Sequence, residues 1–248
     1  MKRLLDVVVS IIGLAVASIV LVPAMVAIWI QDRRSPFYVA ARAGVDGKPF
    51  RMVKLRSMKI LADSTGVTST AGDDPRITAV GRFVRRWKLD ELTQLWNVLK
   101  GDMSLVGPRP QVLQDLVLYT QEERRLLSIR PGVTDLASIV FADEGDILRG
   151  AEDPDLRYQQ IIRPWKSRLA LLYVDRGGGV TVDLRLLWLT VMNSFSRDQA
   201  LAGVAAMVER LGGGAELTRL AKRNAALRPA PPPGATEVFS RGARLAGV

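Results

Sequence analysis

Two adjacent carboxylates, Asp90 and Glu91, are the residues in this chain whose types and spacing best suit chemistry. The pattern that follows them predicts the start of a helix, so both lie near unpaired backbone N–H groups and the positive end of a helix dipole. We therefore expect both carboxylates to be ionised at neutral pH. Several cations lie close to them in the sequence, and so much positive charge suits a site that handles phosphate. These cations are Arg76, Arg82, Arg85, Arg86, Lys88 and Arg109.

The same two carboxylates also have a purely structural interpretation. An Asp at a helix start usually caps the first turn, and a Glu in that turn complements the dipole. On this interpretation the chain is a non-catalytic membrane-associated scaffold, and its Asp-Glu pair is only a helix cap. The predicted helix has an apolar face at helical spacing and a stop signal after it. The apolar face is Leu92, Leu95, Trp96 and Leu99, and the stop is Lys100 with Gly101.

The loop at residues 107–110, Gly-Pro-Arg-Pro, favours the catalytic interpretation. Prolines on both sides of Arg109 hold φ at about −65°, so the loop should be stiff. A stiff loop that presents one guanidinium suits bidentate binding of a phosphate. The alternative for Arg109 is a structural ion pair with a buried acid such as Asp102.

Residues 74–110 resemble the signature of the bacterial sugar transferases, the monotopic phosphoglycosyl transferases that act on polyprenyl phosphate. The matching pieces are DPRIT at 74–78, VGRFVRR at 80–86, LDELTQLWNVLKGDMSLVGPRP at 89–110 and RPGVT at 130–134. The resemblance implies transfer of a sugar 1-phosphate from a UDP-sugar to polyprenyl (undecaprenyl) phosphate, with release of UMP, at the start of glycan assembly. Many members of the family have glycine after the last piece, whereas this chain has Asp135.

The resemblance also implies roles for individual residues. Asp90 and Glu91 fall on the family's Asp-Glu pair, with Asp90 as the nucleophile that carries the phosphosugar and Glu91 as a ligand of Mg²⁺. Residues 54–58, KLRSM, are similar to the family's K-F-R-S-M segment, and two of their cations would project from one face of an extended chain. The alternative for these two cations is a solvated strand edge. We expect the substrate phosphates to be bound by Lys54, Arg56, Arg76 and Arg109.

The chain of 248 residues contains no His and no Cys. Disulfides, thiolate metal sites and the usual general base are therefore excluded, and chemistry must use carboxylates, Lys, Tyr or oxygen ligands. The net charge of +10 favours a polyanionic partner such as a nucleotide, an anionic membrane surface or nucleic acid. Nucleic acid is disfavoured because the cations are scattered, aromatic residues are few and an apolar segment opens the chain. A homo-oligomer is left open.

Residues 7–30 contain no charged residue and predict a membrane-embedded helix. A helix of this length extends about 36 Å, enough to cross a hydrocarbon core of about 30 Å. Cations flank both ends, which favours placing both ends on the cytoplasmic side, and Pro23 can bend the helix. We therefore expect a re-entrant helix at the cytoplasmic face of the inner membrane, as the family resemblance also implies. A single-pass helix stays open, because Val22 replaces the serine that many members have before the proline.

The expected fold class is α+β and mainly helical, with the re-entrant helix, a small β-hairpin and a helical catalytic core with membrane-surface helices. We expect hairpin strands at 37–39 and 50–53, joined through an Asp46-Gly47 turn. Further helices are expected at 111–129, 165–174 and 184–195, and the last is either buried or on the membrane surface. Residues 62–73 are expected to form a mobile loop near the site.

Three regions are predicted along the chain. Residues 1–34 form the membrane anchor, residues 35–198 the catalytic domain, and residues 199–248 an appendage with a partly disordered end. Asp153-Pro154-Asp155 matches the D-x-D pattern that holds a metal in many glycosyltransferases. A helix cap is the favoured interpretation of this short motif.

Overall fold

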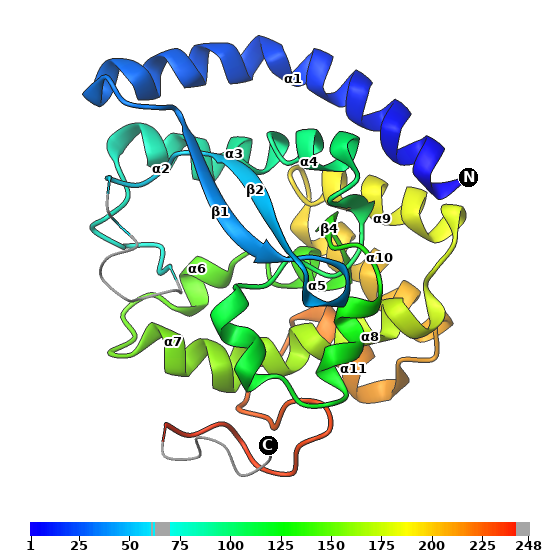
Figure 1. The fold of residues 1–248 in the computed structure, drawn as a ribbon. Helices are drawn as coiled ribbons and strands as arrows, with labels where there is room; N and C mark the ends of the chain where they lie inside the picture. Colours follow the sequence, from blue (N-terminus) through cyan, green and yellow to red (C-terminus); the bar gives the residue numbers. More distant parts are fainter. Residues whose placement is uncertain (61, 63–69, 242–248) are drawn as a thin grey trace.

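The computed structural model describes residues 1–60, 62 and 70–241. The fold is mainly helical and opens with one long apolar helix, α1 (Lys2–Asp32), as expected (Figure 1). Within the described residues the sheet structure consists of two pairs of strands, β1 (Phe37–Ala43) with β2 (Pro49–Leu55) and β3 (Ser104–Val106) with β4 (Gly132–Thr134). Most of the loop expected at 62–73 lies outside the described residues.

The other helices form three groups in chain order. A first group lies beneath α1: α2 (Ala79–Arg86), α3 (Leu89–Leu92) and α4 (Leu95–Lys100) (Figure 1). A second group is α5 (Leu136–Val140), α6 (Glu144–Ile147), α7 (Pro154–Arg157), the π-helix η5 (Tyr158–Ile162) and α8 (Arg163–Arg176). The last group is α9 (Val180–Met192), α10 (Arg197–Arg210) and α11 (Gly214–Lys222). Short 3₁₀ turns are η1 (Val45–Gly47), η3 (Leu113–Leu118) and η4 (Glu123–Ser128).

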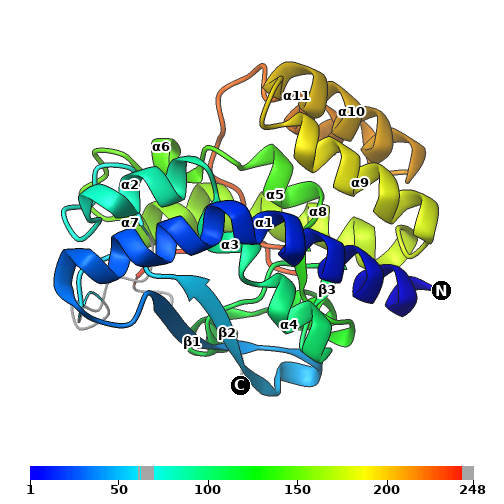
Figure 2. The same cartoon turned by 90° about the horizontal axis from the view of Figure 1, so that it is seen from above.

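Both ends of α1 are held against the same domain. At its start, Lys2 Nζ donates hydrogen bonds to the carbonyl oxygen of Val106 (3.0 Å) and to Asp183 Oδ2 (2.6 Å). At its end, Asp32 forms an ion pair with Arg56 (2.5 Å). Figure 2 shows α1 crossing the domain, with the β1–β2 hairpin on one side and α9, α10 and α11 on the other. By length and composition α1 could cross a membrane, yet it runs along the domain instead of leaving it.

The outer face of α1 is apolar and exposed. The aliphatic side chains on this face are largely exposed, and water is an unfavourable environment for them. The face includes Ile11, Ile12, Val16, Ile19, Val20 and Ile30. The inner face is closed by small and aliphatic residues, among them Ala17, Leu21, Ala24 and Ile28.

The predicted hairpin is confirmed, and its strands are longer than expected. β1 and β2 are antiparallel, with Phe37 opposite Leu55 and Ala43 opposite Pro49. The turn between them places Asp46 at φ 55° and Gly47 at φ 74°, and this left-handed region favours Asp, Asn and Gly. The Asp46-Gly47 signal therefore located the turn correctly.

The β3–β4 pair depends on two glycines in close contact. The strands are parallel, and a Cβ atom on Gly132 would lie 2.1 Å from the backbone nitrogen of Gly107. No other residue fits at this crossing without moving the backbone. The contact joins the 107–110 loop, which follows β3, to the turn that precedes β4.

The helix expected to begin at Asp90 is interrupted, and its buried face differs from the prediction. Residues 93 and 94 separate α3 from α4. Trp96 is 54% exposed, whereas Asn97 is fully buried. The Asn97 side chain accepts a hydrogen bond from the backbone nitrogen of Val53 (3.0 Å) and donates one to the carbonyl oxygen of Arg51 (2.7 Å). These bonds to β2 allow a polar side chain to take the buried position. Gly101, at φ 92°, ends α4 as predicted.

The long helix expected at 111–129 is wrong. The segment contains the two 3₁₀ turns η3 and η4 instead. Glu123 is fully buried and forms an ion pair with Arg163. It also accepts a hydrogen bond from Ser167 Oγ (2.7 Å). Because the buried Glu123 carboxylate must stay paired with these partners, this segment packs into the domain and does not form a continuous surface helix.

The segment after residue 198 packs on the main core. Core residues of α10 and α11 include Leu201, Val204, Val208, Leu217 and Ala221. The tail beyond α11 continues along α8, where Trp165 Nε1 donates a hydrogen bond to the carbonyl oxygen of Arg228 (3.1 Å). The predicted boundary at residue 199 stays a prediction, but the described part of this segment shares one hydrophobic core with the preceding domain.

Candidate active site

The Asp-Glu pair lies on α3, a single turn that begins after a sharp change of direction. Lys88 precedes it at φ 52°, in the left-handed region, and provides no side-chain cap. Thr93 Oγ1 donates hydrogen bonds to the carbonyl oxygens of Asp90 (3.0 Å) and Val53 (3.1 Å), which ties α3 to β2. No side chain caps α3, and both carboxylates lie in its first turn, where they complement the helix dipole.

The carboxylate of Asp90 has no hydrogen bond or ion pair within the part of the chain that the structure describes. Burial raises the pKa of Asp90, and the negative charge of Glu91 adds to this, while the positive charge of Lys54 opposes it. The charges of Arg85 and Arg109 also favour the ionised form. Asp90 is therefore a partly buried, uncommitted carboxylate surrounded by cations.

Glu91 behaves differently because it has a partner. Arg109 donates a hydrogen bond to Glu91 Oε1. Burial alone would raise the pKa of Glu91, but the charges of Arg109 and Lys54 outweigh it and lower the value to about 2. Glu91 in turn raises the pKa of Arg109. The two adjacent carboxylates thus have opposite pKa shifts, one upward and one downward.

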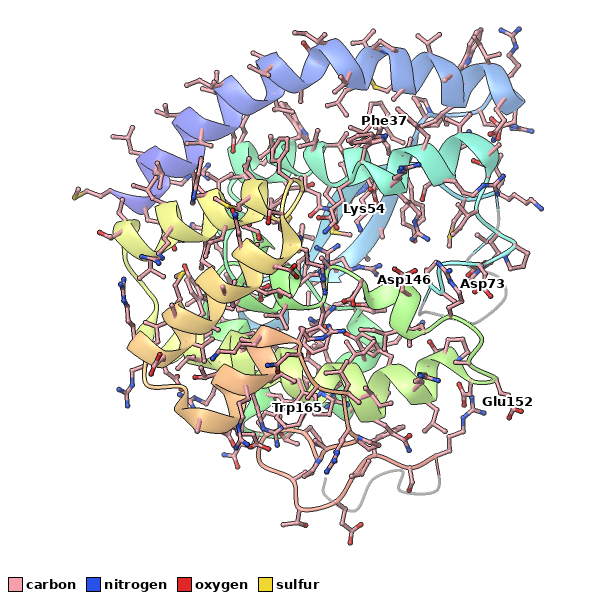
Figure 3. All side chains as sticks on the ribbon, turned by 180° about the vertical axis from the view of Figure 1, so that it is seen from behind. Phe37, Lys54, Asp73, Asp146, Glu152 and Trp165 are labelled. Carbon is pink, nitrogen blue, oxygen red and sulfur yellow. The ribbon has the colours of Figure 1, made fainter. Side chains whose placement is uncertain are left out.

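The loop at 107–110 brings Arg109 to the pair, where it forms an ion pair with Glu91. The alternative partner, Asp102, accepts hydrogen bonds from Lys100 Nζ (3.0 Å) and Asn97 Nδ2 (3.1 Å) instead. Lys54 approaches from β2, and Figure 3 shows it beneath the layer of α2–α4, on the side that faces α6 with Asp146. Burial lowers the pKa of Lys54, and the nearby charge of Arg109 lowers it further.

The structure does not bring Arg56 to the site. Its guanidinium donates two hydrogen bonds to Asp32 (2.5 and 2.7 Å) and one to the carbonyl oxygen of Ser35 (2.8 Å). Arg56 therefore holds the end of α1, although it lies only two residues from Lys54. Arg76 forms an ion pair with Asp74 (2.6 Å), which neutralises part of its charge.

Sequence reasoning missed four polar side chains near Arg109. Lys166 on α8 forms an ion pair with Glu144 on α6, and the Lys166 ammonium lies 5.6 Å from the ring centre of Tyr158. The charges of Glu144 and Asp135 interact with that of Arg109. These residues come from separate elements far along the chain, so no local spacing could reveal that they meet.

A cavity at another place in the fold contains neither carboxylate of the pair. It has a volume of about 540 Å³ and opens between the end of α1 and the start of α2. Its lining includes Asp32, Lys59, Ile60, Ile77 and Arg82. In the D-x-D motif, Asp153 caps α7 by accepting a hydrogen bond from Leu156 N (3.1 Å), as the favoured interpretation expected.

The family profile described as "Bacterial sugar transferase" matches residues 1–197. The chain belongs to the bacterial sugar transferase family. The match includes α1, the Asp-Glu pair and Arg109, and it ends where α10 begins. The expected family membership is thereby confirmed.

Three relatives of this sugar transferase illustrate the range of named activities. It is 42% identical over 164 residues to an undecaprenyl-phosphate galactose phosphotransferase of Salmonella typhimurium, covering 59% of this chain and 34% of the relative. It is 36% identical over 173 residues to a UDP-glucose:undecaprenyl-phosphate glucose-1-phosphate transferase of Caulobacter vibrioides. This match covers 67% of this chain and 65% of the relative. A transferase of the same name from Escherichia coli is 34% identical over 206 residues, which cover 79% of this chain and 40% of the relative. The chain spans less than two thirds of the length of each of these relatives.

The donor set of the sugar transferase site fits Mg²⁺ when a substrate contributes phosphate oxygens. Among the described residues there is no cluster of three or more Asp or Glu side chains that would hold a metal by itself. Mg²⁺ usually binds through one or two carboxylates together with substrate phosphates and water. Glu91 fits this pattern, because the bond from Arg109 uses only one of its two oxygens.

Proposed function

We propose that this bacterial sugar transferase moves a sugar 1-phosphate from a UDP-sugar to undecaprenyl phosphate and releases UMP, in the service of glycan assembly. The observation that carries the proposal is the carboxylate of Asp90, which has no bonded partner within the described residues and lies among Lys54, Arg85 and Arg109. A structural carboxylate in such surroundings would form an ion pair. A nucleophile must stay uncommitted.

The proposed reaction has two steps. In the first, an oxygen of Asp90 bonds to the sugar-linked phosphorus, and the bond from that phosphorus to the oxygen shared with the UMP phosphate breaks. In the second, a phosphate oxygen of undecaprenyl phosphate bonds to the same phosphorus, and the bond to Asp90 breaks. The product is undecaprenyl-diphosphate-sugar, and the Asp90 carboxylate is restored.

Charge neutralisation is the main task of the surrounding residues, because a carboxylate and a diphosphate repel each other. Arg109 can hold a phosphate through its guanidinium, and its bond to Glu91 fixes where that guanidinium lies. Lys54 and Arg85 add positive charge next to Asp90. Mg²⁺, when bound at the pair with Glu91 as a ligand, supplies further charge neutralisation for the phosphates.

We further propose that α1 is a re-entrant helix at the cytoplasmic face of the inner membrane. Lys2 and Asp32, near its two ends, are bonded to the same domain, so a helix that carried the chain across the membrane would have to break one set of these bonds. The apolar outer face would lie in one leaflet. Trp188 on α9, 61% exposed, suits the lipid–water interface, in keeping with a membrane-surface helix.

The test of the proposed activity is the release of UMP. Protein purified in detergent is incubated with a panel of nucleotide sugars and Mg²⁺, with and without undecaprenyl phosphate. We expect steady UMP release only when undecaprenyl phosphate is present. Without acceptor, intact-protein mass spectrometry should find a sugar phosphate added to the wild type but not to Asp90→Asn. No UMP from any nucleotide sugar would favour the scaffold interpretation.

The test of topology uses cysteines placed at positions 1 and 248 in a chain that has none of its own. An impermeant thiol reagent applied to intact cells should label neither position before lysis. Labelling of position 1 alone would establish a single-pass helix. Pro23→Ala restores the backbone N–H that proline lacks inside α1 and should shift the population toward spanning.

A further inference from the structure

Asp135 is a buried carboxylate with half of its hydrogen-bonding capacity unused. The residue is 1% exposed. Its Oδ1 accepts hydrogen bonds from the backbone N–H and the hydroxyl of Ser138, both at 2.6 Å, and thereby caps α5. Its Oδ2 is buried and has no hydrogen-bond partner within the described residues. Burying an acceptor without a partner destabilises a protein, so this oxygen points to a partner that the described residues do not supply.

Asp135 lies at the same edge of the parallel strand pair as the arginine loop. β3 and β4 run parallel, so their carboxyl ends meet at one edge, and ligands bind preferentially beyond such edges. The 107–110 loop follows β3 at this edge, and Asp135 directly follows β4. The backbone nitrogen of Gly107 donates a hydrogen bond to the carbonyl oxygen of Thr134 (3.0 Å), which holds the loop next to Asp135.

The side chains around Asp135 form a polar group that is separate from the Asp-Glu pair. Lys166 and Arg109 are the two cations whose charges act on Asp135. Lys166 is 16% exposed and is paired with Glu144, whose charge also acts on Arg109. Arg109 is bonded to Glu91 of the pair, and its charge also interacts with those of Asp135 and Glu144.

We propose that Asp135, with Glu144 and Lys166 beside it, recognises the sugar of the nucleotide sugar, and that Asp135 Oδ2 accepts a hydrogen bond from a ring hydroxyl. The inference rests on the proposed function. A carboxylate repels phosphate but is a strong acceptor for a hydroxyl donor. The sugar is bonded directly to the phosphate that Asp90 attacks, so it must lie next to the cations that hold that phosphate. Glu144 and Lys166 supply a further acceptor and a donor for a polyhydroxylated ring.

The experiment uses Asp135→Asn, which keeps the size of the side chain. The amide oxygen can still accept the two hydrogen bonds from Ser138, while the amide nitrogen replaces Oδ2 and turns an acceptor into a donor. We measure kcat/KM for UMP release with UDP-sugars that differ by one epimeric or one missing hydroxyl. In the wild type, loss of the recognised hydroxyl should lower kcat/KM by roughly 10- to 100-fold. In Asp135→Asn, loss of the same sugar hydroxyl should leave kcat/KM almost unchanged.

Inhibition by UMP is the control, because UMP carries no sugar and its inhibition constant should be the same in both proteins. An unchanged sugar preference in Asp135→Asn would overturn the inference, and Oδ2 would then hold only an ordered water.

An equal loss of kcat/KM toward every sugar together with weaker UMP inhibition would also overturn it, because the role of Asp135 would then be structural. If Asp135→Asn fails to fold, Glu144→Gln must show the flattened preference instead. Absence of UMP release by the wild type would contradict the proposed function, whereas wild-type turnover with unchanged preference in the variant would contradict only this inference.

Discussion

Arg109 donates a hydrogen bond to Glu91 and so joins the stiff loop at 107–110 to the helical turn that carries Asp90. The bond gives the two adjacent carboxylates different states. The guanidinium lowers the pKa of Glu91 to about 2, while the Asp90 carboxylate has a raised pKa and no bonded partner among the described residues. A pair of titratable groups whose surroundings shift their pKa values in opposite directions is typical of a division of roles in catalysis.

Asp90→Asn should abolish UMP release while leaving thermal stability close to that of the wild type. The amide cannot form the acyl phosphate, and Asp90 makes no side-chain cap whose loss would unfold α3. UMP release and thermal melting measure the two effects. Turnover near the wild-type rate, with no deamidation visible by mass spectrometry, would contradict the covalent mechanism.

Glu91→Gln should retain the fold but lower activity in a way that depends on Mg²⁺ concentration. A neutral amide binds a divalent cation more weakly than a carboxylate, so added Mg²⁺ should restore part of the activity. Titration of Mg²⁺ against UMP release in both proteins measures this. An equal fractional loss at every Mg²⁺ concentration would assign Glu91 to positioning Arg109 instead.

Arg109→Met should lower both activity and stability. It removes a phosphate ligand and leaves the partly buried Glu91 without its partner, which should cost about 1–3 kcal/mol of unfolding free energy. The double variant Arg109→Met/Glu91→Gln should be destabilised by less than the sum of the two single variants, because residue 91 is then neutral and leaves no charge without its partner. Urea unfolding measures all three proteins. Strict additivity would show that the two side chains do not interact.

The acid limb of the pH–activity profile should lie above the ordinary pKa of an aspartate, about 3.9. Asp90 attacks only as a carboxylate, and burial raises its pKa, so activity is lost as the pH falls through that raised value. Lys54→Met removes a positive charge that favours the ionised form, so the limb should move to higher pH. Lys54→Arg keeps the charge and should leave the limb in place. Profiles of kcat/KM against pH report this ionisation in the free enzyme, and a limb that stays fixed in Lys54→Met would contradict the assignment.

Arg56→Met should weaken the attachment of α1 and leave the chemistry intact. Arg56 binds Asp32 and the carbonyl oxygen of Ser35, and it contacts neither carboxylate of the pair. The loss of stability should be small, because Asp32 is partly exposed and water screens the pair. Thermal melting and the KM for the UDP-sugar separate the effects. A large rise in KM with unchanged melting would restore Arg56 to the substrate site.

The sequence alone determined the elements whose causes are local. An uncharged apolar run predicts α1, an Asp-Gly pair predicts the turn between β1 and β2, and Gly101 predicts the end of α4. The prolines around Arg109 predict a stiff loop for the same reason, because ring closure restricts φ without reference to the rest of the chain. The long match between residues 74 and 110 and the family signature pointed to the correct family.

Only the tertiary structure decided which side chains meet. Lys54 and Arg56 are only two residues apart. The charge of Lys54 acts on Asp90, whereas Arg56 forms an ion pair with Asp32 at the end of α1. Asn97 and Glu123 are buried although both are polar, since β2 and α8 supply their hydrogen bonds. Asp135 lies close to Arg109 because two parallel strands end at one edge. Such contacts depend on elements distant in the chain, whose packing no local pattern encodes.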